Sequence, residues 1–431
     1  MSKCSIGIAS ADITPGARTQ LYALEGKRRT GVQVLDPLSV TAMCIDTGDG
    51  ELAFVVSVDV IWLSAQFCDR VRRELTGLCA TPEENVFIAA THTHASPQML
   101  ENSRNLAPLD LAYERQLMEA ILTSATAARA RKSPAVIKVG RIHCPVAVYR
   151  RKAIPDTTMI KRFRWKTMMA NRPVPEHSID DVLTSIRIED LNGGLRAILL
   201  NLACHPTLIR ADAVSADYPG RIRQQVKARY GKHVVTLFLQ GFSGNLKPAF
   251  YKNSRFSWAA PFRSVYSLAF DRLQFCKDTG EPELEIVASK VLACMESAAY
   301  SVVAVNGVAI KSHLARVELA ERGQGRSVDL RLHALRLSDD LVLVGLSGEV
   351  FMEYGLWLRR ILPGVVPVGC CGGMEGYIPD QEALDRGGYE VDRSLDDFGR
   401  KARFADGVEE KVKRMIRESM PRVSVALMEA E

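Results

Sequence analysis

Residues 85–95 read Asn-Val-Phe-Ile-Ala-Ala-Thr-His-Thr-His-Ala, an apolar run that ends in two histidines. The apolar run predicts a buried strand, and side chains two positions apart on a strand share one face. The imidazoles of His92 and His94 are therefore expected to point into one pocket. Neutral imidazole is the commonest metal ligand among side chains. Capping of the strand end is the structural alternative, but a His-x-His pair at such a place favours a metal or catalytic site.

A third histidine follows a second apolar strand. Residues 195–204 are largely apolar, and His205-Pro206-Thr207 comes next. Proline cannot join a strand ladder and biases the residue before it towards an extended conformation. His205 is thus a further candidate ligand at a strand end. We expect structural or exposed roles for His143, which follows a short strand and has no expected acidic partner, and for His233 and His333.

A carboxylate follows a third apolar strand. Residues 341–346 carry no polar side chain, Ser347-Gly348 turns the chain, and a helical pattern begins at Glu349. In the first turn of a helix, a negative charge is favoured by the helix dipole, and this alone would explain Glu349. With histidines at comparable strand ends, Glu349 becomes a candidate ligand as well. Zinc bound by His and carboxylate, with one position left open for water, is the usual catalytic arrangement.

Apolar runs and helical periodicity alternate along the chain. Strands are expected near residues 38–46, 51–60, 85–90, 135–142, 182–190, 195–204, 234–240, 308–317, 327–337, 341–346 and 423–427. Helices are expected near residues 65–79, 111–131, 219–230, 257–275, 284–300, 349–362 and 397–420. Turn residues at 47–50 and 192–194 predict two hairpins. Hairpins combined with helical crossovers indicate an α/β fold of mixed β-sheets flanked by helices.

Composition is that of an ordinary globular protein and gives no sign of nucleic-acid binding. Hydrophobic residues make up 47% and charged residues 25% of the 431 positions, which are ordinary values. The candidate residues are widely scattered and no Pro-, Gly- or Ser-rich linker separates them, so we expect one domain spanning 1–431. Lys and Arg exceed Asp and Glu by only 56 to 50, which does not indicate nucleic-acid binding. The basic stretch from Arg150 to Lys166 is expected to be a solvated loop.

The N-terminal residues and the cysteines predict a cytoplasmic protein. Met1-Ser2-Lys3-Cys4 leads directly into a strand without the features of a secretory signal. No apolar run reaches the length of a membrane helix. The ten cysteines are therefore expected to be reduced thiols.

Blocks of sequence spread over nearly the whole chain carry a family resemblance. They are Ile6–Gly16, Thr91–His94, Asp180–Asp190, Asn201–Thr207, Ser215–Gly220, Gln240–Asn245, Gly348-Glu349, Gly376–Pro379 and Gly387–Glu390. In this order they resemble the neutral/alkaline (non-lysosomal) ceramidases, which are zinc-dependent amide hydrolases. No single block is specific, but their common order is hard to explain otherwise.

The resemblance implies a set of site residues. The zinc ligands would be His92, His205, Glu349 and Tyr377. Three further residues would be catalytic, namely His94, Tyr389 and Arg150, with Arg151 as the alternative to Arg150. The implied reaction is cleavage of an N-acyl (amide) bond by metal-activated water. Arg150 and Tyr389 would stabilise the developing oxyanion, and His94 would move protons.

The sequence departs from the family pattern at several points. Ala95-Ser96-Pro97-Gln98 replaces a Ser-Gly-Pro-Gly segment, and Asn245-Leu246-Lys247-Pro248 lacks a serine that could be suspected as a nucleophile. The second departure favours attack by metal-activated water. We also expect no C-terminal immunoglobulin-like domain of the kind that full-length ceramidases carry. The substrate is therefore expected to be a soluble or modestly amphiphilic N-acyl amide rather than membrane-embedded ceramide.

Three alternatives remain open. The same zinc site could cleave an ester or a lactone. An amidohydrolase barrel also uses His-x-His after a strand, but it would require more ligand histidines downstream than this chain supplies. A non-catalytic, ceramidase-like binding protein ranks last, because all four implied ligand positions hold residues able to bind metal. The sequence makes no prediction of the oligomeric state or of a second metal.

Overall fold

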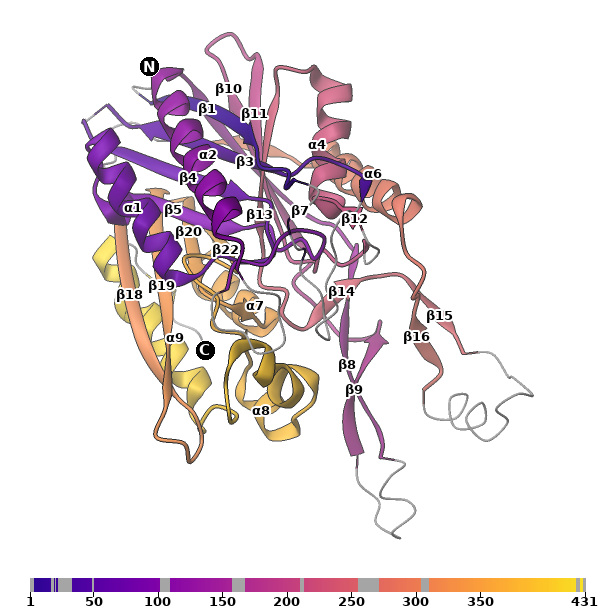
Figure 1. The fold of residues 1–431 in the computed structure, drawn as a ribbon. Coiled ribbons are helices and arrows are strands. Elements are labelled where there is room, and N and C mark those ends of the chain that lie inside the picture. Colours follow the sequence, from indigo (N-terminus) through magenta and orange to yellow (C-terminus); the bar gives the residue numbers. More distant parts are fainter. Residues whose placement is uncertain are drawn as a thin grey trace.

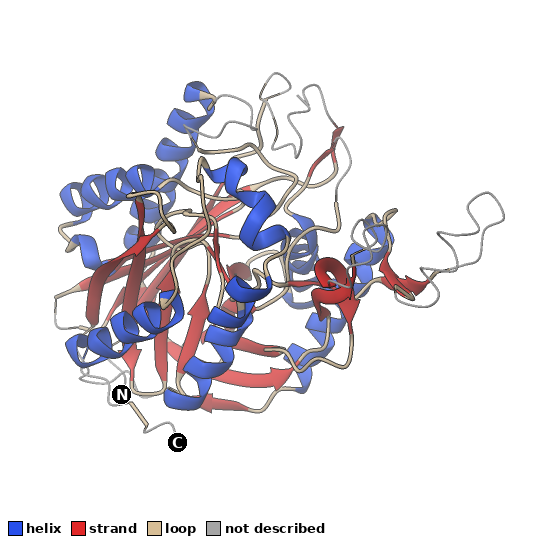
Figure 2. Cartoon of the chain, turned by 90° about the horizontal axis from the view of Figure 1, so that it is seen from below, coloured by secondary structure: helices blue, strands red, loops and turns tan. Residues whose placement is uncertain are grey.

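The fold, a computed structural model, consists of mixed β-sheets flanked by helices, as the alternating pattern predicts (Figures 1 and 2). The structure describes residues 4–428 apart from 17–18, 20, 22–32, 49, 101–108, 157–166, 210–212, 255–270, 304–309 and 424–426. Most of the expected helix at 257–275 and the basic residues 161–166 lie outside these described residues.

Three larger sheets form the body of the molecule. The first has the order β5-β4-β3-β1-β6, with strands Val86–Ala90, Leu52–Val58, Ser39–Asp46, Ser5–Asp12 and Ser133–Pro134. The second has the order β13-β11-β10-β7-β17, with strands Val235–Gln240, Leu195–Leu202, Val182–Glu189, Val136–His143 and Tyr300–Val302. The third has the order β18-β19-β20-β22, with strands Lys311–Ala320, Ser327–Ser338, Leu341–Leu346 and Val365–Val368. Both predicted hairpins are confirmed as the antiparallel pairs β3–β4 and β10–β11.

The three sheets share one apolar core between their inner faces. It contains Met43, Val55 and Phe87 from the first sheet, with Leu199 from the second and Leu343 from the third. Helices cover the outer faces with separate cores. They are α1 (Ala65–Cys79) and α2 (Leu111–Ala130) on the first sheet, α4 (Asp217–Tyr230) and α6 (Glu281–Ser297) on the second, and α7 (Met352–Ile361) and α9 (Val408–Ser419) on the third. Central strands are thus buried on both faces, which explains their continuous apolar runs.

Helix α1 shows how the local sequence sets an element's limits. Ser64 begins the helix because its hydroxyl accepts the N–H of Phe67 at 3.1 Å, an ordinary N-cap. Phe67, Val71 and Leu75 recur at helical spacing and are buried against the sheet. Ala80 ends the helix in the left-handed region, at φ 51°.

The ends of parallel strand pairs meet at one edge of the body. β4 runs parallel to β5, and β11 runs parallel to β13. A two-residue parallel pair, β21 (Glu349–Val350) with β23 (Tyr377–Ile378), lies beyond the end of β20. Because ligands bind at the carboxyl ends of parallel strands in open α/β sheets, this edge is the expected place for a site.

A three-stranded sheet completes the surroundings of that edge. Its order is β14-β8-β9, with strands Leu246–Pro248, Ala147–Pro155 and Thr167–Val174 (Figure 1). The expectation of a solvated loop from Arg150 is wrong, because Arg150 and Arg151 are buried in β8. Two-residue and three-residue strands, β12 (Ala213–Val214) with β2 (Gln33–Val34) and β15 (Tyr251–Asn253) with β16 (Leu273–Phe275), lie at the periphery.

Other sequence expectations also need correction. The helix expected from 349 begins only at Met352, because Glu349 and Val350 pair with β23 instead. The helix expected at 397–420 is a 3-10 turn, η4 (Ser394–Phe398), followed by α9, and Gly399 in the left-handed region ends that turn. At the expected last strand, Val423 ends a 3-10 turn and 424–426 lie outside the described part.

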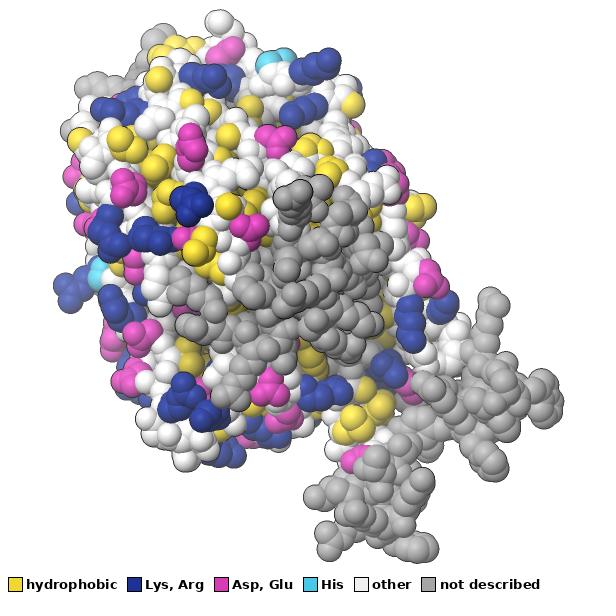
Figure 3. Space-filling view, in the orientation of Figure 1, with side chains coloured by type: hydrophobic (Ala, Val, Ile, Leu, Met, Phe, Trp, Pro, Cys, Tyr) yellow, Lys and Arg dark blue, Asp and Glu magenta, His cyan; other side chains and the backbone are white. Residues whose placement is uncertain are grey.

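The described surface carries charges of both signs. On the face drawn in Figure 3, Lys and Arg side chains are interspersed with Asp and Glu. This mixture matches the small charge surplus of the sequence. Within the described residues, no helix combines the length and the apolar character needed to cross a bilayer.

Candidate metal centre

His92 leaves β5 with its ring held in one orientation. The backbone N–H groups of Thr91 and His92 donate to Val58 O at 2.8 Å and Val60 O at 3.0 Å. His92 adopts φ 70°, a left-handed conformation that is uncommon outside glycine and clusters at functional sites. Its Nδ1 lies 2.6 Å from Ile61 O, so Nδ1 carries the proton. The lone pair of His92 is therefore on Nε2, on the far side of the ring.

His205 approaches from the end of β11 in the same way. Its Nδ1 lies 3.3 Å from Ser243 O, which again places the lone pair on Nε2. The Nε2 atoms of His205 and His92 are 3.2 Å apart. Two lone pairs at this distance repel one another unless a cation lies between them. The Nε2 of His94 is also close, at 3.0 Å from that of His205, and these three histidines form a group able to hold a metal ion.

Glu349 adds a carboxylate to the imidazoles. Its Oε2 lies 3.3 Å from His92 Nε2 and 3.7 Å from His205 Nε2. Glu349 is buried, and this oxygen has no hydrogen-bond partner. A buried, unpaired carboxylate oxygen is costly, and it is doubly so when it faces imidazole lone pairs. The donor set of nitrogen and carboxylate oxygen, together with this orphaned atom, fits a zinc ion.

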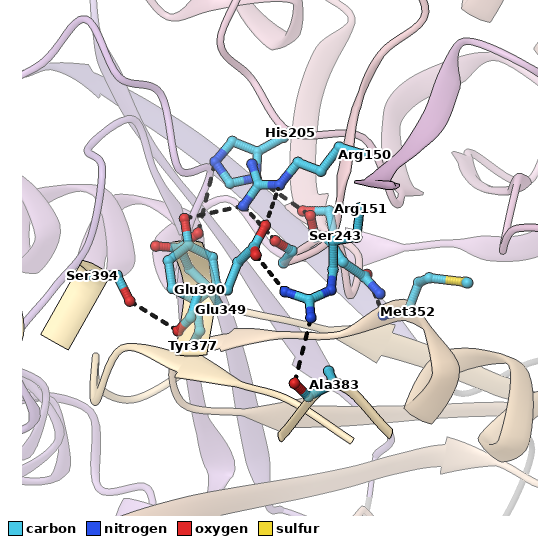
Figure 4. A network of polar contacts seen from close by, with 12 residues as sticks. Arg150, Arg151, His205, Ser243, Glu349, Met352, Tyr377, Ala383, Glu390 and Ser394 are labelled. Carbon is cyan, nitrogen blue, oxygen red and sulfur yellow. Dashed lines mark hydrogen bonds and ion pairs between the residues drawn. The ribbon is translucent and has the colours of Figure 1, made fainter. Parts of the chain in front are cut away.

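Tyr377 lies beside Glu349 because the two residues are register partners in the β21–β23 pair. Side chains of such partners project from the same face of a sheet, about 5 Å apart. Arg150 Nη2 donates to Tyr377 Oη at 3.2 Å, and the guanidinium lies 5.5 Å from the centre of the tyrosine ring (Figure 4). Burial raises the pKa of Tyr377, and the nearby Glu349 raises it further. The structure thus places Tyr377 at the edge of the histidine group, where its role as a ligand remains a prediction.

Arg150 and Arg151 are both buried and held by buried partners. Arg150 donates through Nε to Glu390 Oε1 at 3.0 Å and through Nη2 to Gly244 O at 2.6 Å. Arg151 donates through Nη1 to Glu390 Oε2 at 2.5 Å and through Nη2 to Gly387 O at 2.7 Å. Of the two, Arg150 is the one that contacts Tyr377, and it lies on the side of His205 (Figure 4).

A strand irregularity makes this arrangement possible. Adjacent residues of a regular strand point to opposite faces, so Arg150 and Arg151 could not normally reach one carboxylate. The β8–β9 register is irregular at this point, because Tyr149 and Arg151 on β8 face Val174 and Asn171 on β9, which has one residue more between them; such irregularities are common next to active sites. Sequence reasoning missed both this irregularity and Glu390, although Glu390 ends one of the sequence blocks.

Tyr389 is the first residue of a short π-helix, η3 (Tyr389–Arg393). Its ring lies 6.0 Å from that of Tyr377 at an interplanar angle of 71°. Burial, followed by the charge of Glu349, raises the pKa of Tyr389, so the phenol keeps its proton at neutral pH and remains a hydrogen-bond donor. No contact of Tyr389 with the histidines is seen among the described interactions, and its catalytic role is still a prediction.

Buried carboxylates hold the two histidine-bearing turns, and sequence reasoning missed them. Asp59, after β4, accepts the hydroxyl of Thr91 at 3.2 Å and forms an ion pair with Arg223. Asp217 accepts the backbone N–H groups of Leu208 and Ile209, each at 2.9 Å, just after His205. Asp59 could have been predicted to be buried, because apolar residues flank it in the sequence. Asp217 belongs to one of the sequence blocks.

The surroundings shift the pKa values of His205 and His92 in opposite directions. Burial lowers the pKa of His205, as do the neighbouring His92 and Arg150, which favours the neutral imidazole that metal binding requires. For His92, burial also lowers the pKa, but Cys370 and Glu349 outweigh it and the net direction is upward. A cation in the site would oppose protonation of both rings.

The expectation that His143 lacks an acidic partner is wrong. Asp181 lies across the β7–β10 pair, with its Oδ1 2.7 Å from His143 Nδ1.

Comparisons with known proteins rest on structure alone. No family model matches the sequence, and no curated protein matches it significantly. A crystal structure of neutral ceramidase from Pseudomonas aeruginosa matches with a TM-score of 0.72 at 15% identity, covering 100% of this chain and 77% of that one. The chain has the fold of neutral ceramidase. A structure described as ceramidase complexed with C2 matches with the same TM-score and identity, covering 100% of this chain and 78% of that one.

The neutral ceramidase fold confirms the architecture that the sequence blocks imply. It also excludes the amidohydrolase barrel, because the strands form separate open sheets. At 15% identity the likeness concerns the fold, and the chemistry must be argued from the residues of this chain.

Proposed function

We propose that this protein is a metal-dependent hydrolase of the neutral ceramidase family that cleaves an N-acyl amide bond. The observation that carries the proposal is the meeting of two imidazole lone pairs with the orphaned carboxylate oxygen of Glu349. His92 and His205 present Nε2 atoms 3.2 Å apart, and Glu349 Oε2 lies within 3.7 Å of both. The fold likeness to neutral ceramidase supports the same reaction class by analogy.

Zinc is the ion that this donor set suits best, and His92, His205, Glu349 and Tyr377 would hold it. Bound there, zinc would polarise a carbonyl group and make water a nucleophile at neutral pH. The fixed tautomers of His92 and His205 support this assignment, because each Nδ1–H is already engaged by a backbone carbonyl.

Arg150 and Tyr389 would stabilise negative charge on the carbonyl oxygen of the substrate. The guanidinium of Arg150 is fixed by Glu390 and Gly244, so it needs no rearrangement during the reaction. Tyr389 supplies a phenolic O–H. Donors organised in advance at a developing oxyanion are worth ~3 kcal/mol each in lowering the barrier.

His94 would move protons in the proposed reaction. It is only partly buried, unlike His92 and His205, and its Nε2 lies 3.0 Å from that of His205. In the proposed role, His94 Nε2 would accept a proton from water and deliver it to the leaving amine nitrogen. If His94 instead binds the metal, as the close grouping of the three rings allows, that role falls to another group.

The proposed substrate is less lipid-like than the substrate after which the structural relatives are named. The structural relatives are described as ceramidases, which favours an acyl amide of lipid character. We retain the proposal of a soluble or modestly amphiphilic N-acyl amide. A single catalytic unit and a cytoplasmic location also stay predictions.

Turnover of matched substrates tests the proposed reaction. N-acyl amines with short chains, N-acyl amino acids, detergent-dispersed ceramide and the corresponding esters should be compared before and after chelation. We expect amide hydrolysis that is lost on metal removal and restored by zinc. Ester or lactone cleavage without amide cleavage would favour the first alternative. Metal binding with no turnover of either class would favour the binding-protein alternative.

A further inference from the structure

A cavity lies between α1 and the β18–β19 hairpin, and its lining residues differ from those of the candidate metal centre. Its volume is about 130 Å³. That space exceeds the ~30 Å³ share of a single water molecule several-fold, and so it can hold a small polyatomic ion. Its polar lining consists of Asp69, Arg72, Arg316, Arg331 and His333.

Positive charge in this cavity exceeds negative charge. Arg316 and Arg331 are register partners on neighbouring strands, where like charges directly opposite are destabilising. Arg72 is only 2% exposed. Asp69 is the single carboxylate of the lining, and it accepts from Arg331 Nη1 at 2.7 and 2.8 Å and from Arg72 Nη1 at 3.1 Å. Three guanidinium groups therefore share one carboxylate in the cavity wall.

Three acids lie near the cavity without lining it, namely Glu375, Glu318 and Asp329. Glu375 acts electrostatically on Arg331, but burial raises the pKa of Glu375 to about 7. Near neutral pH the carboxyl is thus only partly ionised. Glu318 and Asp329 form the next register pair on the same face of the hairpin but do not line the cavity, so the excess of guanidinium groups is a property of the lining itself.

The Nδ1 atom of His333 is a hydrogen-bond acceptor in the cavity wall, and no donor among the described residues reaches it. Its Nε2 lies 2.7 Å from Glu84 O, so the proton is on Nε2 and the lone pair is on Nδ1. Nδ1 is buried and has no hydrogen-bond partner. Burial lowers the pKa of His333 to about 3, and Arg72 adds to this, so the ring stays neutral. An occupant would satisfy His333 only by donating a hydrogen bond.

We propose that this cavity is a binding site for a small oxyanion that also carries a hydroxyl group, such as hydrogen phosphate. The oxyanion would accept from Arg72, Arg316 and Arg331, and its P–O–H would donate to His333 Nδ1. Arginine is well suited to this role because its planar donors match phosphate oxygens. The site is independent of the proposed hydrolase activity, since no residue of the metal centre lines it.

Calorimetric titration with inorganic phosphate at neutral pH tests the site in the full chain. We expect saturable binding, and Arg316→Gln should weaken it tenfold or more because one charged donor is lost. Arg316 is exposed on its strand, so the variant should fold. Lys311→Gln is the matched control: Lys311 is also exposed on β18 and pairs with Arg336, but it does not line the cavity. Its affinity should equal that of the wild type.

Sulfate separates the donor requirement from simple charge attraction, because it carries no proton at neutral pH. The wild type should bind phosphate more tightly than sulfate, and His333→Phe should abolish that preference while keeping the packing against Phe87. The proposal is overturned if phosphate shows no saturable binding up to about 10 mM. Equal weakening by Arg316→Gln and Lys311→Gln, or equal wild-type affinity for both anions, would overturn it as well.

Discussion

At the scale of single residues, the candidate site depends on which ring nitrogen of each histidine carries the proton. His92 and His205 each lie against a backbone carbonyl through Nδ1, and this leaves both Nε2 atoms facing Glu349. The sequence predicted these three residues from the ends of apolar strands. Tyr377 could be proposed only through the family resemblance, because tyrosine is an unusual zinc ligand. Glu390 was missed, since only the folded chain brings it 3.0 Å from Arg150.

Glu390 is predicted to be a positioning residue that acts through Arg150. In Glu390→Gln, the two buried guanidinium groups lose their shared negative charge. We expect the free energy of unfolding to fall by ~3 kcal/mol. The turnover number should fall by ~10²-fold, because Arg150 is no longer held in place.

Metal content and kinetics distinguish this role from a ligand role. Glu390→Gln should keep its zinc, and KM should change less than kcat. Glu382→Gln, on the exposed part of α8 (Gln381–Arg386), is the control and should match the wild type in every readout. Loss of zinc in Glu390→Gln, or unchanged kcat, would contradict the assignment.

At the scale of elements, most strands and helices were predictable, and the two features nearest the site were not. Central strands carry apolar residues on both faces, so their runs are plain in the sequence. The β21–β23 pair is only two residues long on each side and joins positions 28 residues apart, at Glu349 and Tyr377. No local pattern can reveal such a pair, and the helical signal of the following residues obscured it. The register irregularity at Arg150 likewise depends on contacts with a partner strand.

Gly348 is predicted to be essential to the β21–β23 pair. It has φ 85°, and a Cβ atom at this position would lie 2.6 Å from Gly376 O. Gly348→Ala should therefore lower the free energy of unfolding by ~1–3 kcal/mol. Displacement of Glu349 should weaken metal binding at the same time.

Gly77→Ala provides the matched glycine control. Gly77 lies inside α1 and has open space around its Cβ position, so the change should stabilise the protein by ~0.5–1 kcal/mol. Urea unfolding measures both variants. Equal stability of Gly348→Ala and the wild type would show that the β21–β23 pair tolerates a side chain there.

At the scale of the whole molecule, the fold class was predictable but the order of strands in the three sheets was not. Alternating patterns indicate mixed sheets with helices. The placement of β22 beside β20, or of β13 beside β11, depends on packing between segments that are distant in sequence. The shared core of the three sheets brings the ends of β5, β11 and β20 to one edge, where the candidate ligands meet.

The metal content of the purified chain, measured by mass spectrometry after zinc loading and dialysis, tests the central claim most directly. We predict one zinc per chain for the wild type and loss of zinc in His205→Ala. His143→Ala is the matched control, because that imidazole is 82% exposed and is not part of the histidine group, and it should keep one zinc. A wild type that retains no zinc, or a His205→Ala variant that retains a full equivalent, would contradict the account.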